Sequence, residues 1–264
     1  MRTLFLILLF ILGACFGSFL CCQARRLRLK ATKKIKNLGS RSICLSCKTQ
    51  LKWFDNIPII SWLALKGKCR KCGKKIGLLE ILSELGLALA FLALGTTINP
   101  LSAAPLEWAI FIFTLFLTLN LAFLAIYDGA YGELPTRYLI ISIFFAFIIF
   151  ALKFSSALSI APFSPELIFE PLLAVTILGG LYLILYLISK GKWVGDGDWL
   201  LGTALGLALS SAWLALINLF LANVLACIIM FPIVKKSKNK KIYFGPFMVI
   251  AFIITLTFSN FLTM

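Results

Sequence analysis

The chain contains no histidine among its 264 residues, and only ten of its residues are acidic. Without histidine it cannot form a Ser-His-Asp or Cys-His nucleophile system, a His-Glu-x-x-His zinc site or an imidazole general base. Any hydrolysis by this chain would therefore have to use carboxylates. The positions of its few acids are accordingly the first place to look for chemistry.

Apolar residues make up 61% of the chain and occur in runs about as long as the roughly 20 residues that cross a bilayer. The runs predict an all-α polytopic membrane protein with about eight transmembrane helices. They lie near residues 3–24, 78–98, 106–127, 138–154, 168–189, 199–215, 217–234 and 244–263. We expect a first helix at 1–24, a small cytosolic domain at 25–77 and a transmembrane catalytic domain at 78–264.

Sixteen of the 26 lysines and arginines lie between the first two apolar runs. Membrane topology explains this clustering better than nucleic-acid binding does. An N-terminus outside the cell would leave four segments inside, and these hold 24 of the 26 cations. They are residues 25–77, 128–137, 190–198 and 235–243. The positive-inside rule therefore predicts an external N-terminus.

The first apolar run also resembles a bacterial lipoprotein signal peptide, because Arg2 precedes it and Leu12-Gly13-Ala14-Cys15 lies within it. Cleavage there would place the sixteen-cation segment outside, against the charge rule. It would also place paired thiols outside the reducing compartment that they prefer. We therefore expect residues 1–24 to remain as an uncleaved helix.

Two Cys-x-x-Cys pairs, Cys44/Cys47 and Cys69/Cys72, lie in the basic segment. Such pairs form tight turns that can meet as a tetrahedral Cys₄ zinc site, and the 21 residues between them allow this. Two redox pairs or ordinary thiols are the alternatives. Four thiolate ligands leave no position on the metal for water, so we expect a structural zinc. The alternative role for the module as a whole is contact between its cations and anionic lipid.

Acids stand at the ends of two predicted helices on the predicted cytosolic side. Asp128 ends the third, and Gly195-Asp196-Gly197-Asp198 precedes the sixth. A single acid at such a position is often only interfacial. Paired carboxylates in a poorly solvated site cannot both ionise cheaply, so one becomes a base and the other an acid. Gly195 and Gly197, which lack a Cβ atom, would let a substrate backbone approach closely.

These motifs together resemble the type IV prepilin peptidases, which are membrane aspartyl proteases of the GxGD class and also N-methyltransferases. Residues 17–20 (GSFL) resemble the end of that family's first helix, and residues 41–72 resemble its cytosolic zinc module. The resemblance identifies Asp128 and Asp198 as the catalytic pair and leaves Asp196 at a variable position. Glu84 matches a family glutamate.

The sequence departs from the family pattern at Cys21, where asparagine is usual, and at Thr136, where aspartate is usual. No glycine-rich S-adenosylmethionine signature is visible, so the expected methylation and its donor rest on the resemblance alone.

The resemblance implies an enzyme of the bacterial inner membrane, with its active site at the cytosolic face. It would remove the basic leader from type IV prepilin or type II secretion pseudopilin precursors and methylate the new N-terminus. Its partners would be those precursors and the lipid bilayer. The alternative is a proton-coupled transporter with a zinc-stabilised cytosolic domain, in which the acids form a proton relay. Against it, Asp128 and Asp198 lie at helix ends, whereas transport sites lie near the bilayer midplane.

Overall fold

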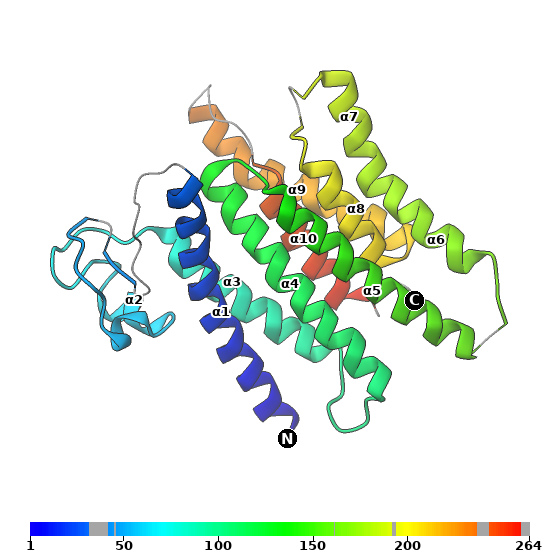
Figure 1. The fold of residues 1–264 in the computed structure, drawn as a ribbon, viewed down its shortest axis with the longest axis horizontal. Helices are drawn as coiled ribbons and strands as arrows, with labels where there is room; N and C mark the ends of the chain where they lie inside the picture. The colour runs from blue at the N-terminus through cyan, green and yellow to red at the C-terminus, as the bar shows by residue number, and fades with distance from the viewer. Residues whose placement is uncertain (32–41, 45, 161, 192–193, 237–242, 260–264) are drawn as a thin grey trace. The chain divides into compact units, whose positions relative to one another are not determined.

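The computed structural model describes most of the chain (Figure 1). The described residues are 1–31, 42–44, 46–160, 162–191, 194–236 and 243–259. Parts of the predicted module 25–77 and of the basic segment 235–243, together with the end of the predicted helix 244–263, lie outside them.

The described residues are predominantly helical, as the apolar runs predict. The elements in chain order are α1 (Arg2–Ala31), η1 (Trp53–Asn56), α2 (Ile60–Ala64), α3 (Leu78–Thr96), α4 (Pro105–Tyr131), α5 (Thr136–Ile160), α6 (Glu166–Val175), η2 (Thr176–Gly180), α7 (Leu181–Ser189), α8 (Asp198–Leu209), α9 (Ala212–Lys236) and α10 (Gly245–Thr257). Of the two short elements, η1 is a 3₁₀-helix and η2 a turn of π-helix.

Each of the eight predicted apolar segments contains a helix in its described part, which confirms the all-α polytopic class. The boundary between two of them differs from the prediction, because α8 ends at Leu209 and α9 begins at Ala212, within the predicted segment 199–215. Six helices in the described part of the chain are long and apolar enough to cross a membrane, counting α6, η2 and α7 as one. The other two, α8 and α10, have 12 and 13 residues. At 1.5 Å per residue each is roughly 20 Å long, which is shorter than the hydrocarbon core of a bilayer.

The chain divides into two compact units, Met1–Gly95 and Thr96–Met264. In the first unit, α1 packs closely against α3 through two glycines one turn apart. A Cβ atom on Gly13 would lie 2.5 Å from the backbone oxygen of Leu87, and one on Gly17 would overlap the backbone of Ser83. This is the small-x-x-x-small contact through which helices approach each other in membranes.

In the second unit α8 is the central helix, with contacts to α5, α6, η2, α7, α9 and α10. Three of its side chains, Leu201, Ala204 and Leu205, are completely buried. Gly202 and Gly206 lie against the backbone of the helix formed by α6 and η2, and a Cβ atom on Gly206 would lie 2.5 Å from the backbone oxygen of Ala174. The second unit therefore uses the same kind of glycine contact as the first.

A partly buried lysine binds the C-terminal end of α8. Lys153 on α5 donates a hydrogen bond from Nζ to the backbone oxygen of Ala208, at 2.8 Å. The last carbonyl groups of a helix have no partner within the helix and carry partial negative charge. The ammonium group satisfies one of them, which fixes α8 against α5 at the end opposite Asp198.

We expect Gly206→Ala to lower the stability of the protein by about 1–3 kcal/mol, because the added methyl group must push α8 away from Ala174. Gly86→Ala is the matched control, since no described atom outside its own helix lies within 4 Å of the position of its Cβ. This control should be stabilised by up to about 1 kcal/mol. Thermal unfolding of the detergent-purified proteins measures both, and equal midpoints would contradict the prediction.

Candidate metal centre and carboxylate site

The first Cys-x-x-Cys pair closes a tight turn. The backbone N–H of Lys48 donates to the oxygen of Cys44, and the N–H of Cys44 donates to the oxygen of Thr49, both at 2.9 Å. The turn requires a left-handed residue after its second cysteine, and Lys48 adopts it with φ 53°. Lysine tolerates this conformation less well than glycine does.

The second pair forms the same turn. The N–H of Gly73 donates to the oxygen of Cys69 at 2.9 Å, and the N–H of Cys69 donates to the oxygen of Lys74 at 2.8 Å. Here the left-handed position is a glycine, with φ 67°. Two equivalent turns therefore present two thiols each.

The turns bring four sulfur atoms together in a cluster. The Sγ atoms of Cys44, Cys47, Cys69 and Cys72 all lie within 4.8 Å of one another. Cys44 and Cys72 are 3.9 Å apart. A tetrahedral zinc with bonds of about 2.3 Å to each sulfur places the sulfurs about 3.8 Å apart. The cluster therefore fits a Cys₄ zinc site, and zinc there would hold the two turns together.

Hydrogen bonds favour the thiolate, which is the form that binds metal, at two of the four cysteines, whereas the pKa of Cys72 is raised to about 11, with burial and its hydrogen bonds to the other cysteines raising it. The hydroxyl and the backbone N–H of Thr49 lower the pKa of Cys47 to about 6. Backbone N–H groups of Cys72 and Lys71 also lower the pKa of Cys69. These donors belong to the turns themselves, so the fold of the module favours the thiolate form of Cys47 and Cys69.

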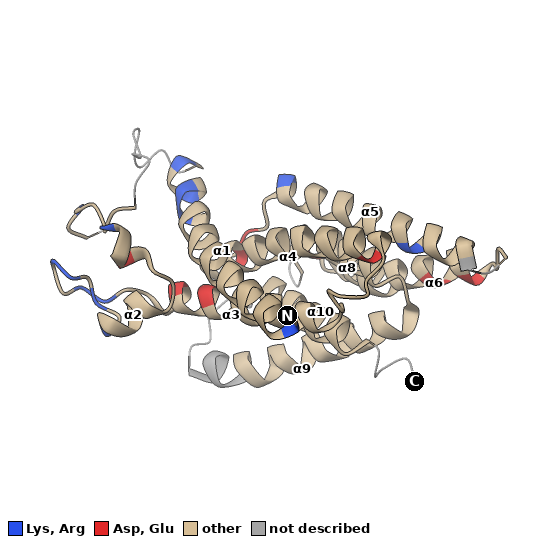
Figure 2. Cartoon of the chain, turned by 90° about the horizontal axis from the view of Figure 1, so that it is seen from below, with Lys and Arg blue, Asp and Glu red and all other residues tan. Residues whose placement is uncertain are grey.

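Asp55 connects the segment between the two pairs to the second turn. Its carboxylate accepts a hydrogen bond from Nε of Arg70 at 2.9 Å and one from the backbone N–H of Lys52 at 3.2 Å. The guanidinium of Arg70 also lies over the ring of Phe54, 5.0 Å from its centroid. Figure 2 shows the basic character of this module and of the C-terminal end of α1.

Glu84 on α3 joins the module to the two long helices of the first unit. It is buried, and its Oε2 accepts the backbone N–H of Ile59 at 2.7 Å. It is also hydrogen-bonded to the side chain of Ser18 on α1. Ile59 has φ 64°, a costly conformation for a β-branched residue. The bond to Glu84 helps to hold that conformation, so the glutamate anchors the turn that leads into α2.

The second unit contains the predicted carboxylates. Asp128 lies in the last turn of α4, which ends where Gly132 adopts a left-handed conformation with φ 69°. Its Oδ2 accepts the backbone N–H of Gly245, the first residue of α10, at 3.0 Å. A helix N-terminus carries unpaired N–H groups and partial positive charge, so it stabilises a carboxylate at this position.

Asp198 begins α8 and is held by its own motif. Its Oδ2 accepts the backbone N–H of Gly195 at 2.9 Å. Gly197 has no Cβ atom, and this makes room for Leu134. A Cβ atom on Gly197 would lie only 2.6 Å from the Cβ atom of Leu134. The Gly-x-Gly-Asp segment is therefore packed against the Leu-Pro segment that follows α4, and both glycines have a role within the protein itself.

The two aspartates are both buried and act on each other electrostatically. Asp128 and Asp198 are 5% and 8% exposed, and their carboxyl groups lie close enough to interact electrostatically. Asp196 is exposed, although its charge also acts on Asp198. Sequence reasoning missed the role of Gly245, whose only signal is a Gly-Pro pair opening an apolar run. It also gave no reason to pair Glu84 with Ser18.

The fold and these two sites define a polytopic membrane protein with a Cys₄ module and two buried carboxyl groups. Comparisons with known proteins show its family. Residues 11–98 match the family described as Bacterial Peptidase A24 N-terminal domain. A prepilin leader peptidase/N-methyltransferase of Klebsiella pneumoniae is 30% identical over 78% of this chain and 83% of its own length. A protein of the same name from Dichelobacter nodosus is 31% identical over 80% of this chain and 68% of its own length.

The chain belongs to the prepilin leader peptidase/N-methyltransferase family. Other relatives match over a shorter part. The member from Myxococcus xanthus is 42% identical over 34% of this chain, which corresponds to 26% of its own length. For the member from Vibrio cholerae the match covers 35% of that protein. No solved structure matches the chain.

We expect the purified protein to contain about one zinc ion per chain, because four thiolates complete one tetrahedral shell. Cys69→Ser should lose most of that zinc and unfold the module, since metal binding supplies much of the folding free energy of such small domains. Elemental analysis measures the metal. Cys227→Ser is the control, because Cys227 lies exposed on α9. Unchanged zinc in Cys69→Ser would rule out this ligand set.

Proposed function

We propose that the protein is a membrane aspartyl endopeptidase that removes the basic leader from type IV prepilin or type II secretion pseudopilin precursors. The observation that carries the proposal is the pair Asp128 and Asp198. The two carboxyl groups come from different helices, are buried, and interact electrostatically. The names of the relatives support the same activity.

In the proposed mechanism the two aspartates share one proton, as carboxylate pairs in poorly solvated sites do. The ionised member takes a proton from a water molecule, whose oxygen attacks the carbonyl carbon of the scissile peptide bond. The protonated member gives its proton to the carbonyl oxygen. The tetrahedral species then breaks its C–N bond: the proton held by the first carboxyl group passes to the leaving nitrogen, and one hydroxyl group of the tetrahedral species returns its proton to the second carboxyl group as the new C=O bond forms.

The hydrogen bonds described above suggest how the two carboxyl groups are oriented. Each aspartate uses Oδ2 to accept a backbone N–H, from Gly245 for Asp128 and from Gly195 for Asp198. We assign Oδ1 of each to the water and to the substrate carbonyl. Backbone donors suit this role because they keep the carboxyl groups in place while the proton moves between them.

We place the enzyme in the bacterial inner membrane, with its N-terminus outside and its active site at the cytosolic face. The distribution of lysine and arginine supports this orientation, since 24 of 26 then lie on the cytosolic side. The substrate's own apolar helix would lie among the transmembrane helices. Its leader junction would then reach Asp128 and Asp198 at the ends of their helices.

We also propose that the protein methylates the amino terminus that cleavage exposes. S-adenosylmethionine supplies a methyl group on a sulfonium: the amine nitrogen forms a bond to the methyl carbon, the C–S bond leaves its electron pair on sulfur, and the amine proton goes to water. The names of the relatives support this second activity.

Asp128→Asn and Asp198→Asn should each reduce cleavage by about 10²–10⁴-fold, because each variant removes one member of an acid/base pair. Asp196→Asn is the control and should retain most of the activity, since Asp196 is exposed. A cleavage assay with a full-length precursor measures all three. The catalytic assignment fails if Asp198→Asn cleaves normally while Asp196→Asn is inactive.

Gly245→Ala should also slow cleavage, by about tenfold or more, because its new Cβ would lie 2.8 Å from Oδ2 of Asp128 and displace the carboxyl group. Gly129→Ala is the matched control on the neighbouring turn, since its Cβ would meet only Pro246 at an ordinary 3.6 Å. Cleavage rates and unfolding midpoints are compared for both. Equal cleavage by Gly245→Ala and wild type would show that the Gly245 hydrogen bond does not position Asp128.

A further inference from the structure

The Cys₄ module carries three large apolar side chains that no other part of it covers. Trp53 on η1 is 79% exposed, and Ile60 and Leu63 on α2 are 64% and 60% exposed. Between residues 42 and 77, no other large hydrophobic side chain that the structure describes is exposed. The proposed cleavage gives these three side chains no role, and exposed apolar side chains gathered in one small module are typical of an interaction surface.

Ile60 and Leu63 lie on one face of α2, because residues three positions apart are neighbours on a helix surface. Another face of α2 is turned toward the module. The ring of Trp62 lies there against Gly67, on which a Cβ atom would lie 2.8 Å from that ring, and the indole nitrogen is buried. The short helix η1 packs against α2, so Trp53 belongs to the same part of the module. α2 is therefore a short amphipathic helix whose apolar face is uncovered.

The distribution of charge along α1 shows where the bilayer ends next to the module. No charged residue occurs between Arg2 and Arg25. At 1.5 Å per residue, residues 3–24 extend over roughly 33 Å, which is close to the roughly 30 Å of hydrocarbon in a bilayer. Arg25 therefore marks the bilayer surface on the side of the module, and there it pairs with Glu80 of α3.

Two hydrogen bonds hold the start of α2 below that surface. Ser18 lies two turns before Arg25 on α1, which is about 10 Å deeper along the helix. The side chain of Glu84 on α3 is hydrogen-bonded to Ser18 and accepts the backbone N–H of Ile59, the residue before α2, at 2.7 Å. Helices that lie in the plane of a bilayer surface bury their apolar face by about 5–10 Å, so α2 begins at the depth of such a helix.

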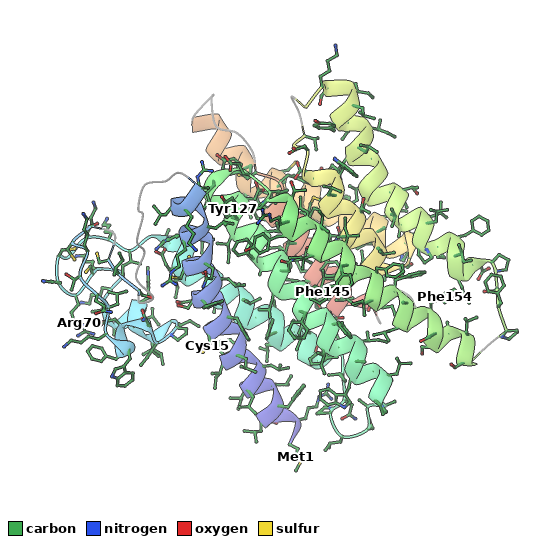
Figure 3. All side chains as sticks on the ribbon, in the orientation of Figure 1. Met1, Cys15, Arg70, Tyr127, Phe145 and Phe154 are labelled. Atoms are coloured by element: carbon green, nitrogen blue, oxygen red, sulfur yellow. The ribbon has the colours of Figure 1, made fainter. Side chains whose placement is uncertain are left out.

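Basic residues flank η1 and α2 in the chain. Lys52 precedes Trp53 and Lys66 follows α2, and both lysines are exposed. Arg70, which is labelled in Figure 3, is exposed as well. Lysine and arginine at a bilayer surface bind anionic headgroups, and tryptophan is enriched at that level. The charge of this segment is therefore complementary to an anionic lipid surface.

We propose that α2 anchors the module in the bilayer leaflet beside it: the side chains of Trp53, Ile60 and Leu63 enter the outer part of the acyl chains, and the flanking lysines bind anionic headgroups. In the orientation proposed above, this is the cytosolic leaflet. Lipid meets α3 at the same depth, because Leu82 lies two residues before Glu84 and is 63% exposed. The apolar face of α2 thus meets the lipid that already surrounds α3, and the anchor holds the Cys-x-x-Cys turns at the bilayer surface.

Labelling from within the bilayer tests the anchor without relying on either proposed activity. Full-length protein is placed in nanodiscs of phosphatidylglycerol and phosphatidylcholine that contain a trace of phospholipid with a diazirine on its acyl chain. After irradiation, mass spectrometry should find carbene adducts on Trp53, Ile60 and Leu63, because these side chains meet the acyl chains. Ser46, which is exposed in the first Cys-x-x-Cys turn, should carry none. Hydroxyl-radical oxidation of a parallel sample reports which of the same side chains meet water.

The double variant Ile60→Asn/Leu63→Asn removes the apolar face and should lower the adducts on Trp53 about threefold or more. Ser46→Asn is the control with the same new side chain, and it should be labelled as wild type is. Zinc content is measured on each variant to establish that the module is folded. If the double variant loses zinc, Leu63→Asn alone should lower the adducts about twofold. Replacing phosphatidylglycerol by phosphatidylcholine should also lower them about twofold, because the lysines lose their anionic partners.

The outcomes separate lipid from the other surroundings of an apolar face. Adducts on Trp53 and α2 that fall in the double variant but not in Ser46→Asn support the anchor. Oxidation of these side chains without adducts would show that they face water, and the anchor is then wrong. If they are neither labelled nor oxidised, a second copy of the chain covers them, which also overturns the assignment to lipid. Equal labelling with and without phosphatidylglycerol would overturn the assignment to anionic lipid.

Discussion

A carboxylate buried in an apolar helical bundle is tolerated only where hydrogen-bond donors replace the water that it has lost. The second unit meets this constraint for Asp128 and Asp198 with backbone N–H groups, from Gly245 and Gly195. Backbone donors carry no proton-transfer chemistry of their own and lose no side-chain entropy. In the proposed mechanism these donors would keep the carboxyl groups in position while a proton moves between them.

This arrangement places demands on the packing of the whole second unit. Asp198 is the first residue of α8, so its position depends on where that helix lies. Gly202 and Gly206 let α8 approach the backbone of α6 and η2, and Lys153 holds its opposite end. Within a membrane, where helices gain little from burying apolar surface, such close contacts and buried hydrogen bonds supply much of the specificity of packing.

The first unit also relies on carboxylates, but as connections between elements. Asp55 joins η1 to the second Cys-x-x-Cys turn, and Glu84 joins the turn before α2 to α1 and α3. The sequence showed Glu84 as an acid near the start of a helix that matches a family glutamate, without showing what it does. Its role is to accept a hydrogen bond from the backbone N–H of Ile59, which lies 25 residues away in the chain and has a positive φ.

The sequence by itself determined the helical class, the order of the apolar segments and the identity of the four thiols, because apolar length and Cys-x-x-Cys spacing are local properties. It also marked Asp128 and Asp198 as candidates, since acids are so few. Tertiary structure decided which donors hold them. Asp128 and Gly245 are 117 residues apart, and their hydrogen bond exists only because α4 and α10 pack together. No local pattern encodes that contact, because it depends on the packing of helices distant in the chain.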